Sequence, residues 1–372
     1  MRPLKLIIVA GARPNFMKIK PILKEIDRIH SFGSPSSISI RAILVHTGQH
    51  YDENMSDIFF RELEIRQPDL NLEVGSASHG VQTANIMIKF EAVCDQERPD
   101  WVVVVGDINS TLACALVCAK MGIRVVHIEA GLRSFDRKMP EEINRIVTDA
   151  LAELLLTPSE DANENLRREG ISEDKIKFVG NIMIDSLVEN LPKARLSGIL
   201  SRLCLDRGRF AFVTLHRPEN VDVRENLSAI MASMEELSKR MPVVFPIHPR
   251  THKMLREFGL MSPLNDRLLL LEPIGYHASL SLTENARLVL TDSGGLQEEA
   301  TFFRTPCLTL RSNTERPITI ILGSNKLTTR ERLLNDAYEA FDGPEHRGQV
   351  PPLWDGRTAE RVMGCILEAS SI

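Results

Sequence analysis

Short, β-rich apolar runs alternate with longer segments of helical period along the whole chain, and this alternation constrains the fold more than any other feature of the sequence. It is typical of βαβ units, in which helices join parallel strands. A basic and polar stretch around residues 190–208 separates two such series. The expected strands lie at residues 4–10, 41–46, 101–105, 124–128, 153–157 and 176–179, and then at 210–214, 243–246, 268–271, 288–291 and 307–310.

The chain length of 372 residues fits two domains of ordinary size. We therefore predict an α/β fold with two doubly wound, Rossmann-like domains whose parallel sheets face each other across a cleft. The N-terminal domain is expected at residues 1–185 and the C-terminal domain at residues 186–355. A last helix at residues 356–372, with apolar residues spaced for one face, is expected to pack across the domain junction.

Composition argues against several classes of protein. Lys and Arg number 45 against 50 Asp and Glu, so the chain lacks the basic excess of a nucleic-acid-binding protein. Its six cysteines form no CxxC pair, which indicates reduced thiols rather than a disulfide framework. The apolar run at residues 6–12 is better explained as a buried first strand than as a signal peptide, and no run is long enough to span a bilayer. We expect a soluble, cytoplasmic protein without a nucleic-acid or membrane partner.

Polar residues follow almost every expected strand. In an open parallel sheet, ligands bind outside the carboxyl ends of the strands, so these residues are the first candidates for a site. They include the segments GARPN at 11–15, TGQH at 47–50, GD at 106–107, EAGLR at 129–133, HRPEN at 216–220, HPR at 248–250 and DSGG at 292–295. Together they would supply carboxylates, histidines and arginines to one cleft.

The DSGG segment lies between an expected strand and the expected helix at residues 296–303. Free N–H groups and the helix dipole favour an anion at such a place, and the adjacent Gly294 and Gly295 let a phosphate approach the backbone. The alternative is an ordinary helix cap by Asp292 or Ser293. The sequence contains neither GxGxxG nor GxxxxGK[ST], which removes the main support for dinucleotide and P-loop chemistry.

Carboxylates at Asp107, Glu129 and the pair Glu141–Glu142 come from three segments of the first domain. Carboxyl groups with different pKa values can act as acid and base around one reacting carbon. A solvated surface acid is the alternative for any one of them, and a first-turn helix position favoured by the dipole is the alternative for the pair.

Metal ligation is not expected. His46 with His50 and His248 with His252 are spaced four residues apart, but no third ligand stands at a recognisable distance in the sequence. Cys114 and Cys118 are explained by packing in an Ala-rich helix. We expect neither a metal nor a cofactor.

The segments above also match a known family. In family order, the chain reads GARPNFMK, TGQHY, GDINSTLA, HIEAGLRSFDRKMPEEINR, TLHRPEN, HPR, TDSGGLQEEA and LRSNTERP, between about residues 4 and 323. With these motifs the chain resembles the non-hydrolysing UDP-N-acetylglucosamine 2-epimerases, which have the GT-B fold.

The resemblance implies reversible inversion at C2 of a UDP-2-acetamido sugar, by anti-elimination of UDP to a 2-acetamidoglucal and re-addition of UDP. It implies a UDP-sugar as the partner molecule and a homodimer. The positions similar to acid/base and leaving-group residues of the family are Asp107, Glu129, Glu141 and His216. The positions similar to nucleotide-binding residues are Arg13, Lys18, Arg145, Ser293, Gly294, Gly295, Glu299 and Arg311, with Glu299 expected on the ribose hydroxyls.

The chain departs from the family pattern at two places. Ser279 stands where relatives usually have an aromatic residue against the uracil, and residues 323–329 read GSNKLTT where many relatives read GTN-x-LVG. Gln49 and His248 resemble residues of a second, regulatory UDP-sugar site in bacterial relatives. Three other functions stay open at this point: a hydrolysing 2-epimerase that releases ManNAc and UDP, a GT-B glycosyltransferase, and a non-catalytic UDP-sugar-binding protein.

Overall fold

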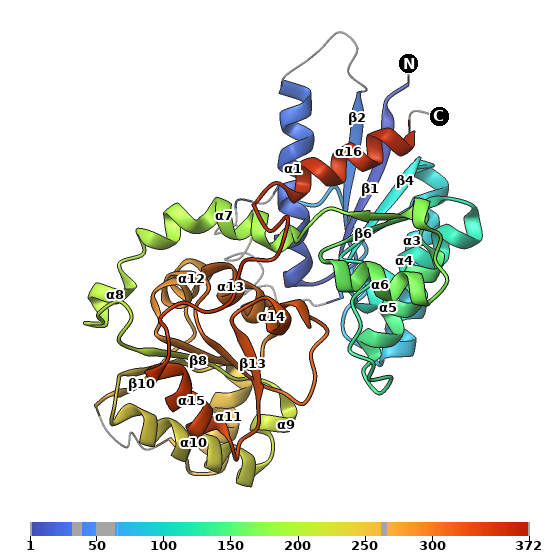
Figure 1. The fold of residues 1–372 in the computed structure, drawn as a ribbon. Coiled ribbons are helices and arrows are strands. Elements are labelled where there is room, and N and C mark those ends of the chain that lie inside the picture. The colour runs from blue at the N-terminus through green and yellow to red at the C-terminus, as the bar shows by residue number, and fades with distance from the viewer. Residues whose placement is uncertain (1, 32–38, 50–63, 65, 262–265, 371–372) are drawn as a thin grey trace. The chain divides into compact units, whose positions relative to one another are not determined.

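The computed structural model describes residues 2–31, 39–49, 64, 66–261 and 266–370 (Figure 1). The chain divides into two compact units. The first comprises Met1–Ser186 together with Pro352–Ile372, and the second comprises Leu187–Pro351. Helix α7 (Ile182–Arg195) carries the chain from the first unit into the second.

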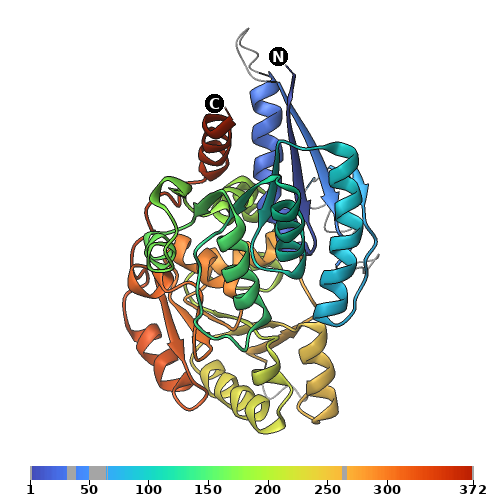
Figure 2. The ribbon, with the colours of Figure 1, turned by 90° about the vertical axis from the view of Figure 1, so that its right-hand side faces the viewer.

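The first unit is built on a seven-stranded sheet in the order β3-β2-β1-β4-β5-β6-β7, with every pair of neighbours parallel. Figure 2 shows α1 and α3 on opposite sides of this sheet, as expected when the strand order reverses between β1 and β4. Its elements are β1 (Leu4–Ala10), α1 (Arg13–Ser31), β2 (Ile40–His46), β3 (Leu70–Asn71), α3 (His79–Glu97), β4 (Trp101–Val105), α4 (Asn109–Met121), β5 (Arg124–Ile128), α5 (Pro140–Leu151), β6 (Leu154–Thr157), α6 (Glu160–Arg168), a 3₁₀ turn (Glu173–Lys175), β7 (Ile176–Phe178) and, at the chain's end, α16 (Thr358–Ser370).

The second unit is built on a six-stranded parallel sheet in the order β10-β9-β8-β11-β12-β13. Its elements after α7 are α8 (Ile199–Arg202), β8 (Ala211–Thr214), α9 (Pro218–Val221), α10 (Arg224–Ser238), β9 (Val243–Pro246), α11 (Pro249–Glu257), β10 (Leu268–Leu271), α12 (Tyr276–Asn285), β11 (Leu288–Thr291), α13 (Gly294–Phe303), β12 (Cys307–Leu310), α14 (Ile318–Ile321), β13 (Asn325–Thr328) and α15 (Leu333–Asp342).

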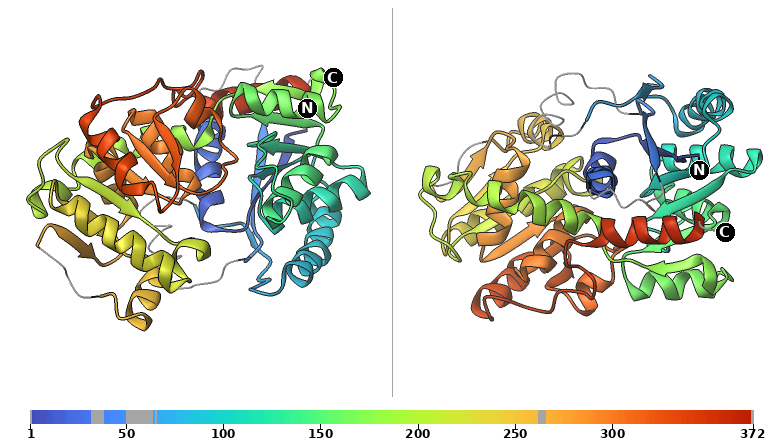
Figure 3. Two further views of the ribbon diagram at one scale, coloured as in Figure 1. Left: turned by 60° about the horizontal axis from the view of Figure 1, so that its bottom comes forward. Right: turned by 90° about the horizontal axis from the view of Figure 1, so that it is seen from above.

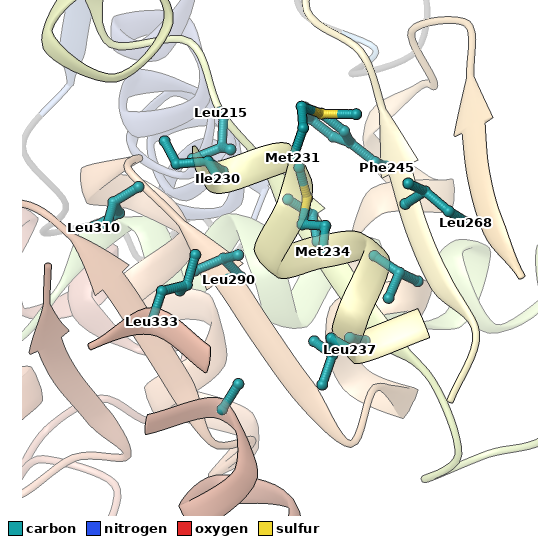
Figure 4. Packing of buried hydrophobic residues seen from close by; sticks show 14 of the residues in the cluster. Leu215, Ile230, Met231, Met234, Leu237, Phe245, Leu268, Leu290, Leu310 and Leu333 are labelled. Carbon is teal, nitrogen blue, oxygen red and sulfur yellow. The ribbon is translucent and has the colours of Figure 1, made fainter. Parts of the chain in front are cut away.

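Apolar residues on both faces of the central strands hold each unit together. All five residues of β4, Trp101–Val105, are buried, which is the pattern of a parallel strand covered by helices on both sides. In the second unit, α10 buries Ile230, Met231, Met234 and Leu237 against residues of β9, β11 and β12 (Figure 4). Their spacing of one, three and four residues places them on one face of the helix.

The sequence predicted these strands well. All eleven expected strands are present, with ends that differ by at most one residue. The structure adds β3 and β13, both at sheet edges, within the ranges it describes. Residues 325–328, within the segment that departs from the family pattern, pair with β12, and the Thr328 hydroxyl donates to Asp336 at 2.6 Å.

The last helix, α16, belongs to the first unit, where it packs against α1 (Figure 3). Its N-terminus is fixed by Asp185, whose carboxylate accepts hydrogen bonds from the backbone N–H groups of Thr358 (3.0 Å) and Ala359 (2.7 Å). No helix within the described ranges combines the length and the apolar character needed to cross a lipid bilayer.

The return of the chain from the second unit depends on Gly180, which has φ +92° and lies against the Leu353 carbonyl. Gly180→Ala should lower the free energy of unfolding by about 2 to 4 kcal/mol, because its Cβ overlaps that carbonyl in addition to straining the backbone. Gly170 has a similar φ of +83° but open space around its Cβ position. The control Gly170→Ala should therefore cost only about 1 kcal/mol. Equal losses in urea denaturation would contradict this explanation.

Candidate active site

The reversal of strand order places three strand ends side by side in the first unit: those of β1, β4 and β5. Asn15, in the first turn of α1, joins two of them. Its side-chain oxygen accepts from the N–H groups of Gly11 (3.2 Å) and Ala12 (3.1 Å), and its amide donates to the Val105 carbonyl at 3.0 Å. Lys18, one turn further along α1, points toward the end of β5.

Lys18 forms a buried ion pair with Glu129, the first residue after β5. Glu129 is 7% exposed and has φ +70°, a left-handed conformation that is unusual for a residue with a side chain. Such backbone strain costs of order 1 to 3 kcal/mol and is concentrated at functional sites. The neighbouring Gly106 also has a positive φ, and a Cβ there would lie 3.0 Å from the Lys18 ammonium and 3.9 Å from the Glu129 carboxylate. Glycine at 106 therefore lets the ion pair approach the backbone.

Asp107 follows Gly106 and pairs with Arg145 of α5. The Asp107 side chain is 29% exposed, whereas the Arg145 guanidinium is 2% exposed. Asn144 adds a hydrogen bond of 2.8 Å from its amide to the Asp107 carbonyl. Asp107 is thus partly exposed and Glu129 almost fully buried, and they pair with two different cations, Arg145 and Lys18.

The two carboxylates of the Glu141–Glu142 pair have different environments. Glu142 accepts hydrogen bonds from the N–H groups of Ser134 (3.0 Å) and Phe135 (2.8 Å) and an ion pair of 2.6 Å from Arg145. Burial opposes ionisation of Glu142, but these donors outweigh it and hold its pKa below the ordinary value. Glu141 is partly exposed in the first turn of α5 and makes no hydrogen bond or ion pair with a described residue.

In the second unit, the reversal of strand order falls between β8 and β11, and Asp292 follows β11. Its fully buried carboxylate accepts from the N–H groups of His216 (3.0 Å) and Arg217 (2.9 Å) and from the His216 ring at 3.0 Å. Burial opposes its charge, but the His216 side chain and these donors outweigh it and lower the pKa of Asp292. Asp292 therefore orders the HRPEN segment and orients His216, whose side chain is 38% exposed.

Helix α13 begins at Gly294, and its N-cap residue Ser293 makes no capping hydrogen bond through its side chain. A Cβ at Gly294 would lie 2.7 Å from the Arg316 guanidinium and 3.0 Å from the Glu315 carboxylate. Glu315 also pairs with Arg311 at 3.0 Å. The start of the helix thus combines uncapped N–H groups with Arg316 close to Gly294, and Arg311 pairs with the neighbouring Glu315.

Comparisons with known proteins identify the family of the chain. A family model described as UDP-N-acetylglucosamine 2-epimerase matches residues 36–367. A UDP-N-acetylglucosamine 2-epimerase of Methanococcus maripaludis is 43% identical, over 97% of this chain and 98% of that protein. The chain belongs to the UDP-N-acetylglucosamine 2-epimerase family. It is therefore an isomerase with the GT-B-like fold that the motifs predicted.

Two further relatives extend the comparison. The crystal structure of the Methanocaldococcus jannaschii UDP-GlcNAc 2-epimerase in complex with UDP-GlcNAc and UDP is 42% identical, with a TM-score of 0.85 over 98% of this chain and 99% of that one. A UDP-2,3-diacetamido-2,3-dideoxy-D-glucuronate 2-epimerase of Pseudomonas aeruginosa is 39% identical over 88% of this chain and 89% of its own length. The 2-epimerases similar to this chain thus include proteins named for different UDP-sugars.

The structure brings together, within the first unit, Lys18 with Glu129 and Asp107 with Arg145. The Arg13 side chain and His50 lie outside what the structure describes. Two residues expected at a regulatory site have local partners: Gln49 accepts a 2.7 Å hydrogen bond from the Ser110 hydroxyl, and His248 caps α11. Ser279 lies near the start of α12 and is partly buried.

Sequence reasoning did not predict the supporting roles of several residues around the two strand-end sites. Asp292 was predicted to belong to an anion-binding segment or to cap a helix, whereas it fixes the HRPEN segment. Glu142, Asp149 and Arg316 are buried ions that hold loops or charged neighbours in place. Their signal in the sequence is weak, because a charged residue within a helix is usually solvated. Among the described residues, no cluster of His, Cys, Asp or Glu could hold a metal ion.

Glu299 is the most strongly perturbed carboxyl of the second unit's site. Burial raises its pKa to about 8, and the neighbouring Glu298 carboxylate adds to the shift while Tyr276 opposes it. Between pH of about 4.5 and 8 the unfolded chain releases the Glu299 proton and the folded chain retains it, so the contribution of Glu299 to stability falls as pH rises.

Glu299→Gln, which mimics the protonated carboxyl, should therefore stabilise the fold at pH 8. The gain should be a few kcal/mol, at about 1.4 kcal/mol per unit of pKa difference, and should vanish near pH 4. Urea unfolding of parent and variant across this range measures it. A difference that stays constant with pH would refute the assigned protonation.

Proposed function

We propose that this chain interconverts the C2 epimers of a UDP-2-acetamido sugar, such as UDP-N-acetylglucosamine and its manno epimer or a modified UDP-HexNAc, without releasing free sugar. The observation that carries the proposal is the placement of Asp107 and Glu129 at the ends of adjacent strands β4 and β5, each paired with a buried cation. The family membership and the UDP-sugars named in the relatives support the substrate class.

The chemistry explains why two carboxylates are needed. A proton at C2 of a 2-acetamido sugar is too weakly acidic for simple removal and return, so its loss is coupled to cleavage of the C1–O bond to UDP. This anti-elimination leaves a 2-acetamidoglucal. UDP then adds back while a proton reaches C2 from the opposite face. One group must therefore take the proton and another must supply it.

We assign these two tasks to Asp107 and Glu129. They differ in burial, since the Asp107 side chain is 29% exposed and Glu129 is 7% exposed. Glu141, which has no partner among the described residues, is the third carboxylate of the proposal. Lys18 forms an ion pair with Glu129, and Arg145 forms one with Asp107. The resemblance implies that both cations also contact the nucleotide.

The second unit holds the UDP in this proposal. The N–H groups at Ser293, Gly294 and Gly295 and the dipole of α13 stabilise the diphosphate, as expected at an uncapped helix N-terminus. Arg311 contributes positive charge, and Glu299 accepts hydrogen bonds from the ribose hydroxyls. His216, oriented by Asp292, stabilises the departing phosphate. Arg13 is assigned to the nucleotide on the resemblance alone.

The experiment that tests the function is incubation with a panel of UDP-HexNAc sugars in deuterated water, followed by NMR. The panel should include UDP-GlcNAc and UDP-2,3-diacetamido-2,3-dideoxy-glucuronate. Deuterium at C2 of an intact UDP-sugar supports the proposal and identifies the substrate. Free ManNAc with UDP indicates a hydrolysing enzyme instead, and binding without exchange indicates a UDP-sugar-binding protein.

Asp107→Asn and Glu129→Gln should each lower kcat about 100- to 10,000-fold, because each removes a proton-transfer group. The UDP dissociation constant should stay nearly unchanged. Asp95→Asn, which alters an exposed carboxylate on α3, is the matched control and should keep the parental rate. Turnover and C2 exchange at the parental rate in both active-site variants would exclude the carboxylate mechanism.

Gly294→Val should raise the UDP dissociation constant at least about tenfold, or about 1.4 kcal/mol. The valine side chain would occupy the space against Arg316 and Glu315. A Cβ at Gly295 would have no atom within 4 Å, so Gly295→Ala should leave the protein's own contacts unchanged. A loss of UDP affinity in this variant would show that the ligand lies against Gly295. Calorimetric titration with UDP measures both. Parental affinity in a folded Gly294→Val protein would remove the diphosphate assignment.

We also propose that the chain acts as a cytoplasmic homodimer. Val81 and Ile88, seven residues apart on α3, are 53% and 68% exposed and form an apolar face suited to a second copy. The six free cysteines fit a reducing compartment. Light scattering coupled to size-exclusion chromatography would measure the mass, and a monomer at micromolar concentration would refute the dimer.

A further inference from the structure

His127, near the end of β5, is fully buried, and both of its ring nitrogens face hydrogen-bond acceptors. Nδ1 lies 2.6 Å from a carboxylate oxygen of Asp149, and Nε2 lies 2.8 Å from the Gly106 carbonyl oxygen. A neutral imidazole carries only one N–H and would set a lone pair against one of these oxygens. Two short contacts to two acceptors are satisfied only when both nitrogens are protonated.

The donors around Asp149 favour its ionised form, so we assign the missing proton to His127 and not to Asp149. One oxygen accepts from the Gly131 N–H at 3.1 Å and forms a 2.7 Å ion pair with Arg133. Burial opposes the charge on Asp149, but His127 and Arg133 outweigh it and hold its pKa below the ordinary range. The proton in the 2.6 Å contact therefore belongs to His127.

The charges around His127 form a network that runs from the buried Asp149 to Glu169, whose side chain is 35% exposed. Arg133 contacts both Asp149 and Glu169. Its Nη1 pairs with Asp149 at 2.7 Å, and its Nε and Nη2 donate to the Glu169 carboxylate at 2.7 and 2.6 Å. The Lys18–Glu129 ion pair lies beside Gly106, the residue whose carbonyl His127 contacts. A protonated His127 thus balances the network formed by Asp149, Arg133 and Glu169, since two cations then face two anions.

The bonds of this network end on the backbone of the two segments that carry the carboxylates. The Gly106 carbonyl accepts from His127, and the Gly106 N–H donates to the Ile128 carbonyl at 3.1 Å, so both backbone polar groups of the residue before Asp107 are bonded. Through Asp149, the same histidine also fixes the Gly131 N–H, two residues after Glu129.

We propose that His127 is a positioning residue, held as an imidazolium by Asp149, that fixes the strand-end segments bearing Asp107 and Glu129 for proton transfer at C2. The proposal rests on the function proposed above for those two carboxylates. The charge matters as well as the hydrogen bond, because only a doubly protonated ring can bind Gly106 and Asp149 at once.

The protonation state can be measured without activity. In ¹⁵N-labelled parent protein at pH 8, NMR of the histidine rings should show His127 with both nitrogens protonated. His46, at the end of β2, is an internal control, because burial lowers its pKa to about 4 and keeps it neutral. Asp149→Asn should leave His127 singly protonated. A singly protonated His127 in the parent protein would overturn the proposal.

The positioning role is tested by His127→Gln, which can donate to Gly106 or to Asp149 but not to both. It should lower kcat about 100-fold, the effect of misplacing a reacting group by about 1 Å, while the UDP dissociation constant stays nearly unchanged. The matched control His46→Gln removes a buried neutral imidazole and should keep the parental kcat. A folded His127→Gln protein with the parental kcat would overturn the role.

The NMR measurement and the kinetics of His127→Gln distinguish a failure of this inference from a failure of the proposed function. If the parent protein catalyses no exchange at C2 with any UDP-HexNAc, the function fails, and with it the positioning role. The NMR result would still decide whether His127 is charged. If the parent protein catalyses exchange but His127→Gln leaves kcat unchanged, only the positioning role fails.

Discussion

The pairing of buried carboxylates with cations and backbone N–H groups is the interaction on which both strand-end sites depend. An isolated buried charge is too costly to keep, so each buried acid has to be surrounded by donors, and those donors are drawn from separate segments of the chain. Asp149 binds His127, Arg133 and Gly131, and Asp292 binds His216 and its neighbours. Removing one partner would leave an uncompensated charge, which is why such clusters fix loops more firmly than apolar contacts do.

The strain at Glu129 follows from the same constraint. Its φ of +70° turns the chain at the end of β5 and brings its carboxylate to Lys18, on a helix that precedes it by more than a hundred residues. An extended conformation would cost less locally, but the Gly131 N–H bound to Asp149 and the N–H of Glu129 bound to the Leu156 carbonyl hold the turn. The surrounding hydrogen bonds therefore maintain a conformation that the residue alone would not adopt, which is the usual condition for strain at a working site.

The sequence predicted what depends on local pattern and missed what depends on tertiary pairing. An apolar run such as Trp101–Val105 predicts a buried strand by itself, and the polar residues that follow it predict the end of the strand. The two added strands lack that signal, because Leu70–Asn71 is too short and Asn325–Thr328 is mostly polar. Lys18 pairs with Glu129, and Asp107 pairs with Arg145, although the partners lie far apart in the chain. No spacing rule applied to the sequence predicts such pairs. The roles of individual site residues came from the family resemblance, and they stay proposals.

The two histidine–aspartate pairs show how burial divides one chemical motif between two tasks. His127 and His216 each contact a buried aspartate, at 2.6 and 3.0 Å. The His127 ring is fully enclosed and its second nitrogen binds a carbonyl, so it has no site left for a ligand. The His216 side chain is 38% exposed, and its remaining nitrogen is not needed to hold Asp292, which also binds backbone N–H groups. In the roles proposed above, the enclosed His127 is a fixed charge that orders the backbone, and the more exposed His216 stabilises a phosphate.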